Sequence, residues 1–124
     1  MPMHESGQMY LEAIYVLLQT KEKIRAIDVG AYLGYTKPSV SRAVGLLKNS
    51  EHITVDSEGY IKMTPKGEEF AAQLYERHTV LTNMLMALGI DEETATEDAC
   101  RIEHVISDKS FSAVKKHYLD YKKN

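Results

Sequence analysis

Apolar residues recur at roughly helical spacing through most of the first half of the chain. The pattern predicts helices over residues 5–20, 27–33 and 36–49. Gly34 suits the end of the second helix, while Thr36 and Pro38 suit the N-cap and the first turn of the third. The spacing thus predicts a long first helix, followed by a shorter helix and another helix joined by a tight turn.

Two short runs with strand-like alternation follow these helices. They cover residues 53–55 and 60–63, and Gly59 between them tolerates the positive φ that hairpin turns often need. This order of elements predicts a winged helix-turn-helix, in which the second helix of the helix-turn-helix enters the major groove of DNA. The alternative is a small α+β core with no role in DNA binding.

The second half of the chain predicts helices only. A long helix begins after residue 65 and ends at Gly89, and two shorter helices cover Asp91 to about Ile106 and Ser110 to about Tyr121. One side of the long helix carries an apolar stripe, made of Phe70, Leu74, Leu81, Leu85 and Leu88. Because these helices provide few residues for a separate core, we interpret the stripe as a homodimer interface.

Charge is distributed unevenly along the chain. The net charge is −3, yet residues 1–66 contain eight Lys/Arg and seven Asp/Glu, whereas residues 67–124 contain seven and eleven. DNA binding needs a local basic surface and not a basic protein, so the total charge does not exclude it. No apolar run is long enough to cross a membrane, and a single cysteine suits a reducing compartment. We therefore expect a cytoplasmic protein with no membrane partner.

A Cys-x-x-Glu-His segment is the strongest candidate for chemistry. Cys100, Glu103 and His104 fall at positions i, i+3 and i+4, so one face of a helix presents three ligands for a divalent transition metal. Three ligands do not close a site, so other helices must contribute. Further candidates are Met9 and Glu12 on the first helix and His78 on the long helix. Each residue also has an ordinary alternative as a packed or solvated side chain.

Four separated segments resemble the diphtheria toxin repressor family of iron- and manganese-dependent regulators. They match, in order, the first helix, the exit from the wing, the dimerisation helix and the metal-binding helix of that family. In this chain they are residues 9–15, 63–67, 77–78 and 99–108. The resemblance implies the short, two-domain form of the family, without the C-terminal β-barrel of its longer iron regulators.

The resemblance also implies a set of metal ligands. Met9, Cys100, Glu103 and His104 match the primary site of the iron-responsive branch. In the manganese-responsive branch the positions of Met9 and Cys100 are acidic and that of Glu12 is a ligand, while His78 matches a ligand position in both. Thioether and thiolate are softer ligands than Mn(II) prefers. We therefore favour Fe(II) as corepressor, keep Mn(II) as possible, and expect Co(II), Ni(II) or Zn(II) to substitute in vitro.

These observations predict a mainly α protein that is a metal-dependent transcriptional repressor and not an enzyme. We expect a winged helix-turn-helix domain at residues 1–64 and an all-helical dimerisation and metal-binding domain at residues 65–124, with no organic cofactor. Arg42 suits the reading of guanine edges, while Lys37 and the neighbouring hydroxyls suit phosphate contacts. The expected contacts to double-stranded operator DNA are Thr36, Lys37, Ser39, Ser41 and Arg42, with Lys62 on the wing.

Two other classes of function remain to be compared. A winged-helix sensor of a small organic ligand or a partner protein would share the fold but would not need the metal ligands. A metallohydrolase fits poorly, because the sequence has no H-E-x-x-H motif, no glycine-rich phosphate loop and no general base apart from the proposed ligands.

Overall fold

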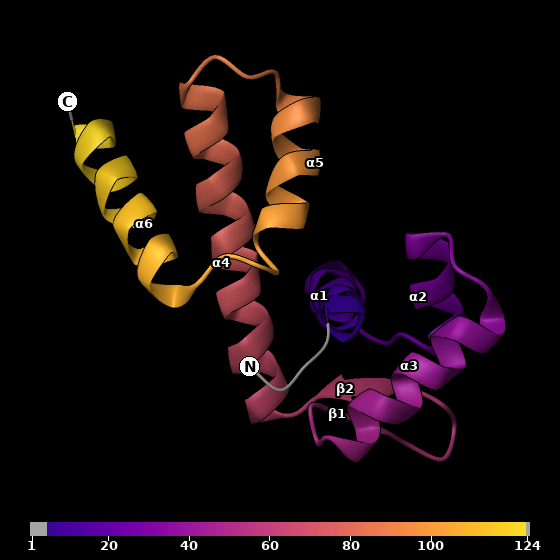
Figure 1. Ribbon diagram of the computed structural model, residues 1–124. Helices are drawn as coiled ribbons and strands as arrows, with labels where there is room; N and C mark the ends of the chain where they lie inside the picture. The colour runs from indigo at the N-terminus through magenta and orange to yellow at the C-terminus, as the bar shows by residue number, and fades with distance from the viewer. Residues whose placement is uncertain (1–4, 124) are drawn as a thin grey trace. The chain divides into compact units, whose positions relative to one another are not determined.

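A computed structural model describes residues 5–123, which form two compact units on either side of the bond between Ala72 and Gln73. The elements are α1 (Glu5–Thr20), α2 (Ala26–Leu33), α3 (Lys37–Asn49), β1 (Ile53–Val55), β2 (Ile61–Met63), α4 (Pro65–Ala87), α5 (Glu92–Ile102) and α6 (Asp108–Lys123), as Figure 1 shows. This order confirms the mainly α class with a winged helix-turn-helix first and helices after it. Within residues 5–123, no helix combines the length and the apolar character that a bilayer span requires.

The first unit packs α1, α2 and α3 with the hairpin around one apolar core. Leu11, Ile14, Ile24, Val29 and Ile61 are almost completely buried in it. Helix α2 ends where Gly34 takes a left-handed φ of 73°, and α3 begins with Thr36 as its N-cap, as predicted. The tight turn between these two helices is therefore built by residues whose backbone preferences match it.

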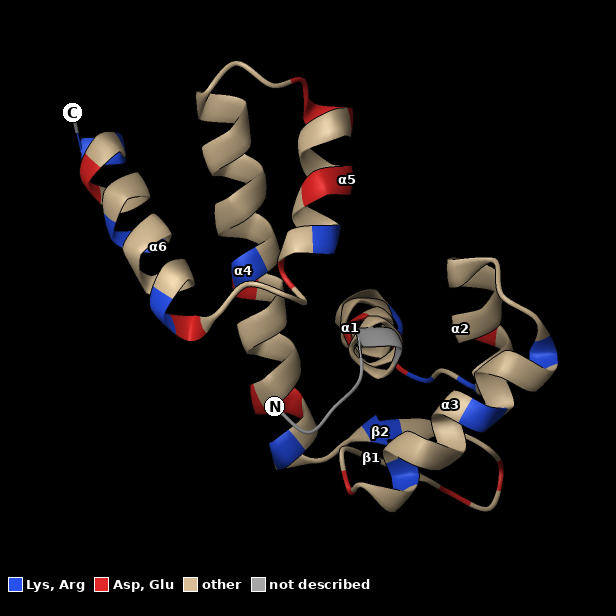
Figure 2. Ribbon diagram, viewed as in Figure 1, with Lys and Arg blue, Asp and Glu red and all other residues tan. Residues whose placement is uncertain are grey.

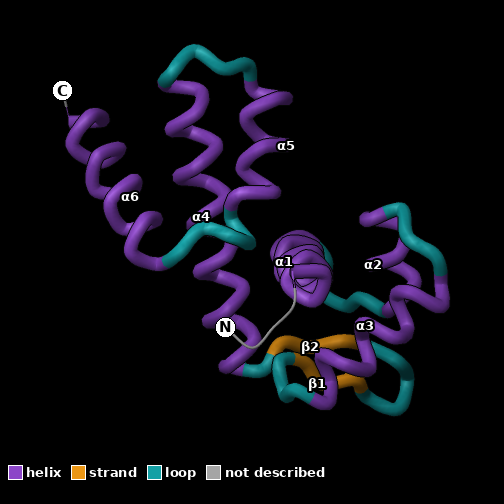
Figure 3. Tube along the Cα trace, in the orientation of Figure 1, coloured by secondary structure: helices purple, strands orange, loops and turns teal. Residues whose placement is uncertain are grey.

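The wing is a two-stranded antiparallel hairpin, drawn in orange in Figure 3. Thr54 lies opposite Lys62 in its register, and Gly59 has the positive φ, 86°, that the sequence predicted. The backbone N–H of Ile61 also donates to the carbonyl of Ile24, at 2.8 Å, in the connector between α1 and α2. This bond attaches the connector to the edge of the hairpin.

The second unit contains the later part of α4 with α5 and α6, which lie on different sides of α4 in Figure 1. Leu81 on α4 packs with Ala99 on α5 and Phe111 on α6 in a small apolar cluster. The predicted interface stripe on α4 was therefore too broad. Leu81 and Leu74 are buried within the chain, whereas Leu88 remains 68% exposed.

Helix α5 is shorter than predicted, because it ends at Ile102 and not near Ile106. The next helix begins at Asp108, two residues before the predicted start. Ser107 explains this start, since its side-chain oxygen accepts from the backbone N–H of Ser110 at 3.0 Å in the manner of an N-cap. The chain thus turns over residues 103–107 within the segment expected to be helical.

Candidate metal centre

The end of α5 brings three potential metal ligands together. One donor atom each from Cys100, Glu103 and His104 lies within 4.8 Å of the others. Although the helix ends at Ile102, Glu103 keeps right-handed helical angles, and its N–H donates to the carbonyl of Ala99 at 2.9 Å. The i, i+3 geometry that the sequence predicted is preserved there for this reason.

Glu103 is the central group of this cluster. Its side chain is completely buried, and its Oε1 lies 3.6 Å from Nε2 of His104. The same Oε1 lies 3.5 Å from Nδ1 of His78, which α4 supplies. Four of the predicted ligands, including Cys100, thus belong to one cluster in the second unit, which we call the α4–α5 cluster: His78, Cys100, Glu103 and His104.

The chemistry of the α4–α5 cluster fits a divalent transition metal. Within residues 5–123, neither carboxylate oxygen of Glu103 takes part in a hydrogen bond, although both are buried. A buried carboxylate needs a compensating partner, because the removal of a charged group from water costs on the order of several kcal/mol. Two imidazoles and a thiol adjoin it, and sulfur, nitrogen and carboxylate oxygen are the usual ligands of Fe(II), Zn(II) and related ions.

Arg77 holds the backbone that follows α5, next to the cluster, and the sequence did not predict this role. Its Nη1 donates to the carbonyls of Glu103, at 3.2 Å, and Ile106, at 2.7 Å, while Nη2 pairs with Asp108. Its guanidinium also lies over the ring of Phe111, 5.3 Å from the centroid. Arg77 thereby satisfies carbonyls that the shortened α5 leaves open. No local signal reveals this role, since the partners lie well over twenty residues further along the chain.

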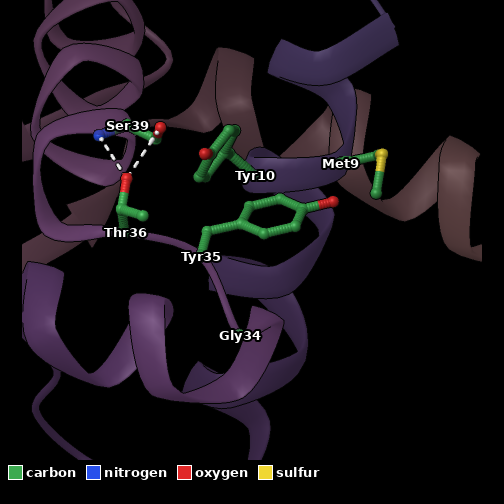
Figure 4. A pocket seen from close by; sticks show the side chains of 6 residues that line it. All are labelled: Met9, Tyr10, Gly34, Tyr35, Thr36 and Ser39. Carbon is green, nitrogen blue, oxygen red and sulfur yellow. Dashed lines mark hydrogen bonds between the residues drawn. The ribbon is translucent and has the colours of Figure 1, made fainter.

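The remaining predicted ligands, Met9 and Glu12, lie on α1 in the first unit. Both side chains are partly buried, and Oε2 of Glu12 is shielded from solvent. Met9 lines a pocket of about 410 Å³ that Tyr10, Tyr35 and the start of α3 also line (Figure 4). Their participation in a metal site stays a prediction.

The predicted DNA contacts differ in how free their side chains are. The hydroxyl oxygen of Thr36 accepts from the N–H of Ser39 at 3.4 Å, and its O–H donates to the Ser39 hydroxyl at 3.0 Å (Figure 4). Thr36 therefore caps α3, and its hydroxyl also contacts the hydroxyl of Ser39. The remaining predicted contacts are exposed, namely Lys37, Ser41 and Arg42 on α3 and Lys62 on β2.

Comparison with known proteins places the chain in a family. A family model described as the metal binding and dimerisation domain of iron dependent repressors matches residues 64–124. The transcriptional regulator MntR of Bacillus pumilus is 31% identical over 109 residues, which are 88% of this chain and 76% of that relative. MntR of Salmonella typhimurium is 32% identical over 104 residues, which are 84% of this chain and 66% of that relative.

Solved structures agree with the sequence comparison. The manganese regulator SloR matches with a TM-score of 0.81 at 28% identity, and the metal-dependent transcriptional regulator MtsR with 0.84 at 25% identity. Each match covers 93% of this chain but only 54% of the other, so the chain spans about half the length of these solved proteins. The relatives are regulators, as predicted, and not enzymes. The chain belongs to the diphtheria toxin repressor family of metal-dependent transcriptional regulators.

Proposed function

We propose that this chain is a cytoplasmic repressor whose affinity for operator DNA is raised by a divalent metal held at the α4–α5 cluster. The observation that carries the proposal is the buried carboxylate of Glu103, which adjoins two imidazoles and a thiol but makes no hydrogen bond within the described residues. A metal would compensate this carboxylate and link the donor atoms around it. The exposed cations of α3 support the DNA-binding half of the proposal.

We further propose that Met9 and Glu12 complete the ligand set. A metal with ligands from both units would restrict the arrangement of the winged helix-turn-helix and select one that fits successive major grooves. DNA would then tighten metal binding by the same factor by which metal tightens DNA binding. The soft donors Met9 and Cys100 favour Fe(II), whereas Glu12 and His78 keep Mn(II) as an alternative.

We propose a homodimer as the binding species, because operator-binding helix-turn-helix proteins are commonly two-fold symmetric. The end of α4 and the turn after it offer exposed apolar residues for such an interface: Met86, Leu88 and Ile90. In this proposal they take the place of Leu74 and Leu81, which belong to the predicted stripe but are buried within the chain. Replacing Leu88 with Glu should shift the chain towards monomer in sedimentation experiments, while Lys109→Glu, an exposed position on α6, should not.

An anaerobic titration tests the metal-dependent repressor directly. Duplexes enriched from a randomised pool by the metal-loaded chain would be titrated with protein plus Fe(II), Mn(II), Co(II), Zn(II) or a chelator. We expect the chelator to weaken binding at least tenfold, and the Cys100→Ser and His104→Ala variants to behave like the chelated protein. Unchanged binding by both variants would instead favour a winged-helix sensor that needs no metal.

The choice of metal needs a separate comparison. The double variant Met9→Asp/Cys100→Asp replaces both sulfur donors with carboxylates, which Mn(II) prefers. We expect this variant to shift the metal response from Fe(II) towards Mn(II) in the same titration. An identical order of metals for the variant and the parent chain would show that these two positions do not select the metal.

A further inference from the structure

The connector between α1 and α2 is hydrogen-bonded to the edge of the wing and reaches α2 through Arg25, whose backbone is extended. The N–H of Ile61 donates to the carbonyl of Ile24, and both side chains are almost completely buried in the core of the first unit. Neighbouring side chains in an extended segment point to opposite faces. Residues on either side of these two isoleucines therefore point outward, away from that core.

The outward-pointing neighbours are three cations and a tyrosine. Lys23 and Arg25 flank Ile24, while Tyr60 and Lys62 flank Ile61. All three cations are exposed and the tyrosine is half-buried. We call this group of four residues the wing platform. In Figure 2 the connector and β2 both carry blue, basic segments in the same unit.

A tyrosine ring organises two of these cations. Nζ of Lys23 lies 5.1 Å from the centroid of the Tyr60 ring, and Cζ of Arg25 lies 4.4 Å from it. A cation over an aromatic face is held by the ring quadrupole, with an energy of about 0.5–1 kcal/mol at an exposed site. The ring therefore holds two positive charges near each other despite their mutual repulsion.

The charges of the wing platform are not neutralised locally. Within residues 5–123, neither Lys23, Arg25 nor Lys62 forms an ion pair. The acids of the hairpin lie in its turn, where Oδ1 of Asp56 already accepts from the N–H groups of Glu58 and Tyr60, both at 2.9 Å. Asp28 on α2 accepts from the backbone N–H of Arg25 at 2.8 Å and pairs with Lys21 at 3.9 Å. Three exposed cations without ion pairs thus form a local site for an anionic polymer.

We propose that the wing platform binds the phosphate backbone of DNA, as an anchor separate from the recognition helix. The inference rests on the proposed function and adds contacts that the sequence did not predict at Lys23, Arg25 and Tyr60. The place of Arg25 in the chain supports this proposal. Arg25 is the N-cap of α2, and α2 leads through Gly34 directly to α3, the predicted recognition helix. Lysine, arginine and tyrosine side chains are common phosphate donors, and such contacts fix register without reading sequence.

The salt dependence of binding to a duplex of arbitrary sequence tests this proposal. Each neutralised phosphate contributes about 0.9 to the slope of log K against log salt, so Lys23→Gln/Arg25→Gln should reduce the slope by about 2. The same loss lowers the affinity by roughly 10- to 100-fold at about 0.1 M salt. The preference among base sequences should stay unchanged, as measured by competition with the enriched duplexes.

Matched variants separate a local contact from net charge. Lys109→Gln/Lys116→Gln removes the same charge from exposed positions on α6 and should leave the slope within experimental error of the parent. Lys23→Arg/Arg25→Lys should retain the slope, and thermal unfolding should show that all variants fold. An unchanged slope for Lys23→Gln/Arg25→Gln, or an equal change in the α6 control, would overturn the wing platform. If the parent chain itself binds no duplex with metal, the proposed function fails instead.

Discussion

Gly67 occupies a position where no larger side chain fits. An added Cβ would lie 1.9 Å from the carbonyl oxygen of His52, and both groups belong to the backbone framework that joins the hairpin to α4. Thr64 reinforces the same junction, since its hydroxyl donates to the carbonyl of Glu51 and accepts from the N–H of Gly67. The start of α4 therefore packs closely against the segment that leads into the hairpin.

Replacing Gly67 with Ala should consequently destabilise the protein. Overpacking of this kind costs about 1–3 kcal/mol, and more where backbone atoms cannot move aside. Gly45→Ala in α3 is the matched control, because its Cβ would meet nothing within 4 Å and alanine favours a helix by about 0.5–1 kcal/mol. Urea unfolding of the two variants should give changes of opposite sign. Equal stabilities would show that the junction adapts.

His52 should make the stability of the folded chain depend on pH. Burial, followed by the nearby charge of Lys66, lowers the pKa of His52 below its ordinary value of 6.5. Because the unfolded chain takes up this proton more readily, stability is fully present above pH 6.5 and declines as the pH falls through that value towards the folded pKa. The ring packs edge-on against Phe70, with centroids 5.7 Å apart, and its Nδ1 lies 2.7 Å from the Ser50 hydroxyl.

His52→Gln should flatten this part of the stability profile. We expect the parent chain to lose more stability than the variant between about pH 6.5 and pH 5 in chemical unfolding without metal. His117→Gln, on the exposed surface of α6, should retain the slope of the parent. Parallel profiles for the parent and His52→Gln would assign the pH dependence to other groups.

At the scale of elements, local sequence signals account for the first unit better than for the second. Gly34, Thr36 and Gly59 act through their own backbone preferences, and the structure has the turn, the cap and the hairpin where these residues predict them. The end of α5 depends instead on Arg77, whose partners come from a distant part of the chain. Helical spacing alone therefore predicted that α5 continues to about Ile106, beyond its end at Ile102.

The same distinction applies to the candidate site. The spacing of Cys100, Glu103 and His104 within one segment allowed their grouping to be predicted. His78 was a separate candidate on the long helix, and its approach to Glu103 requires the packing of α4 against α5, which helical spacing does not reveal. A ligand set that joins separate elements is a tertiary property, so local periodicity does not encode it.

Arg77 should be the residue on which the α5–α6 junction depends. Arg77→Ala removes the donor to two partly buried carbonyls, and hydrogen bonds to charged groups contribute about 1.5–3 kcal/mol. Asp108→Asn is the control, because Asp108 is 97% exposed and exposed ion pairs contribute about 0–1 kcal/mol. In thermal unfolding, the midpoint of Arg77→Ala should lie well below that of Asp108→Asn. Similar losses for both would assign the effect to the ion pair and not to the carbonyls.

At the scale of the whole molecule, the two units differ in where their charges lie and in predicted role. The first has exposed cations on α3 and the wing platform, while acidic residues mark α5 in the second (Figure 2). Such a division suits a protein whose first unit meets a polyanion and whose second holds a cation. The proposed ligands Met9 and Glu12 would connect these two roles, since they belong to the first unit.

Metal-dependent stability can test that connection without DNA. A metal that binds only the folded chain stabilises it by about 2.7 kcal/mol at one hundred times its Kd. With Fe(II) under anaerobic conditions, His104→Ala should lose most of this increment. Met9→Leu should also reduce it if one ion takes ligands from both units, whereas Met63→Leu in the core of the first unit should not. A full increment in Met9→Leu would confine the ion to the α4–α5 cluster, and metal would then need another route to influence α3.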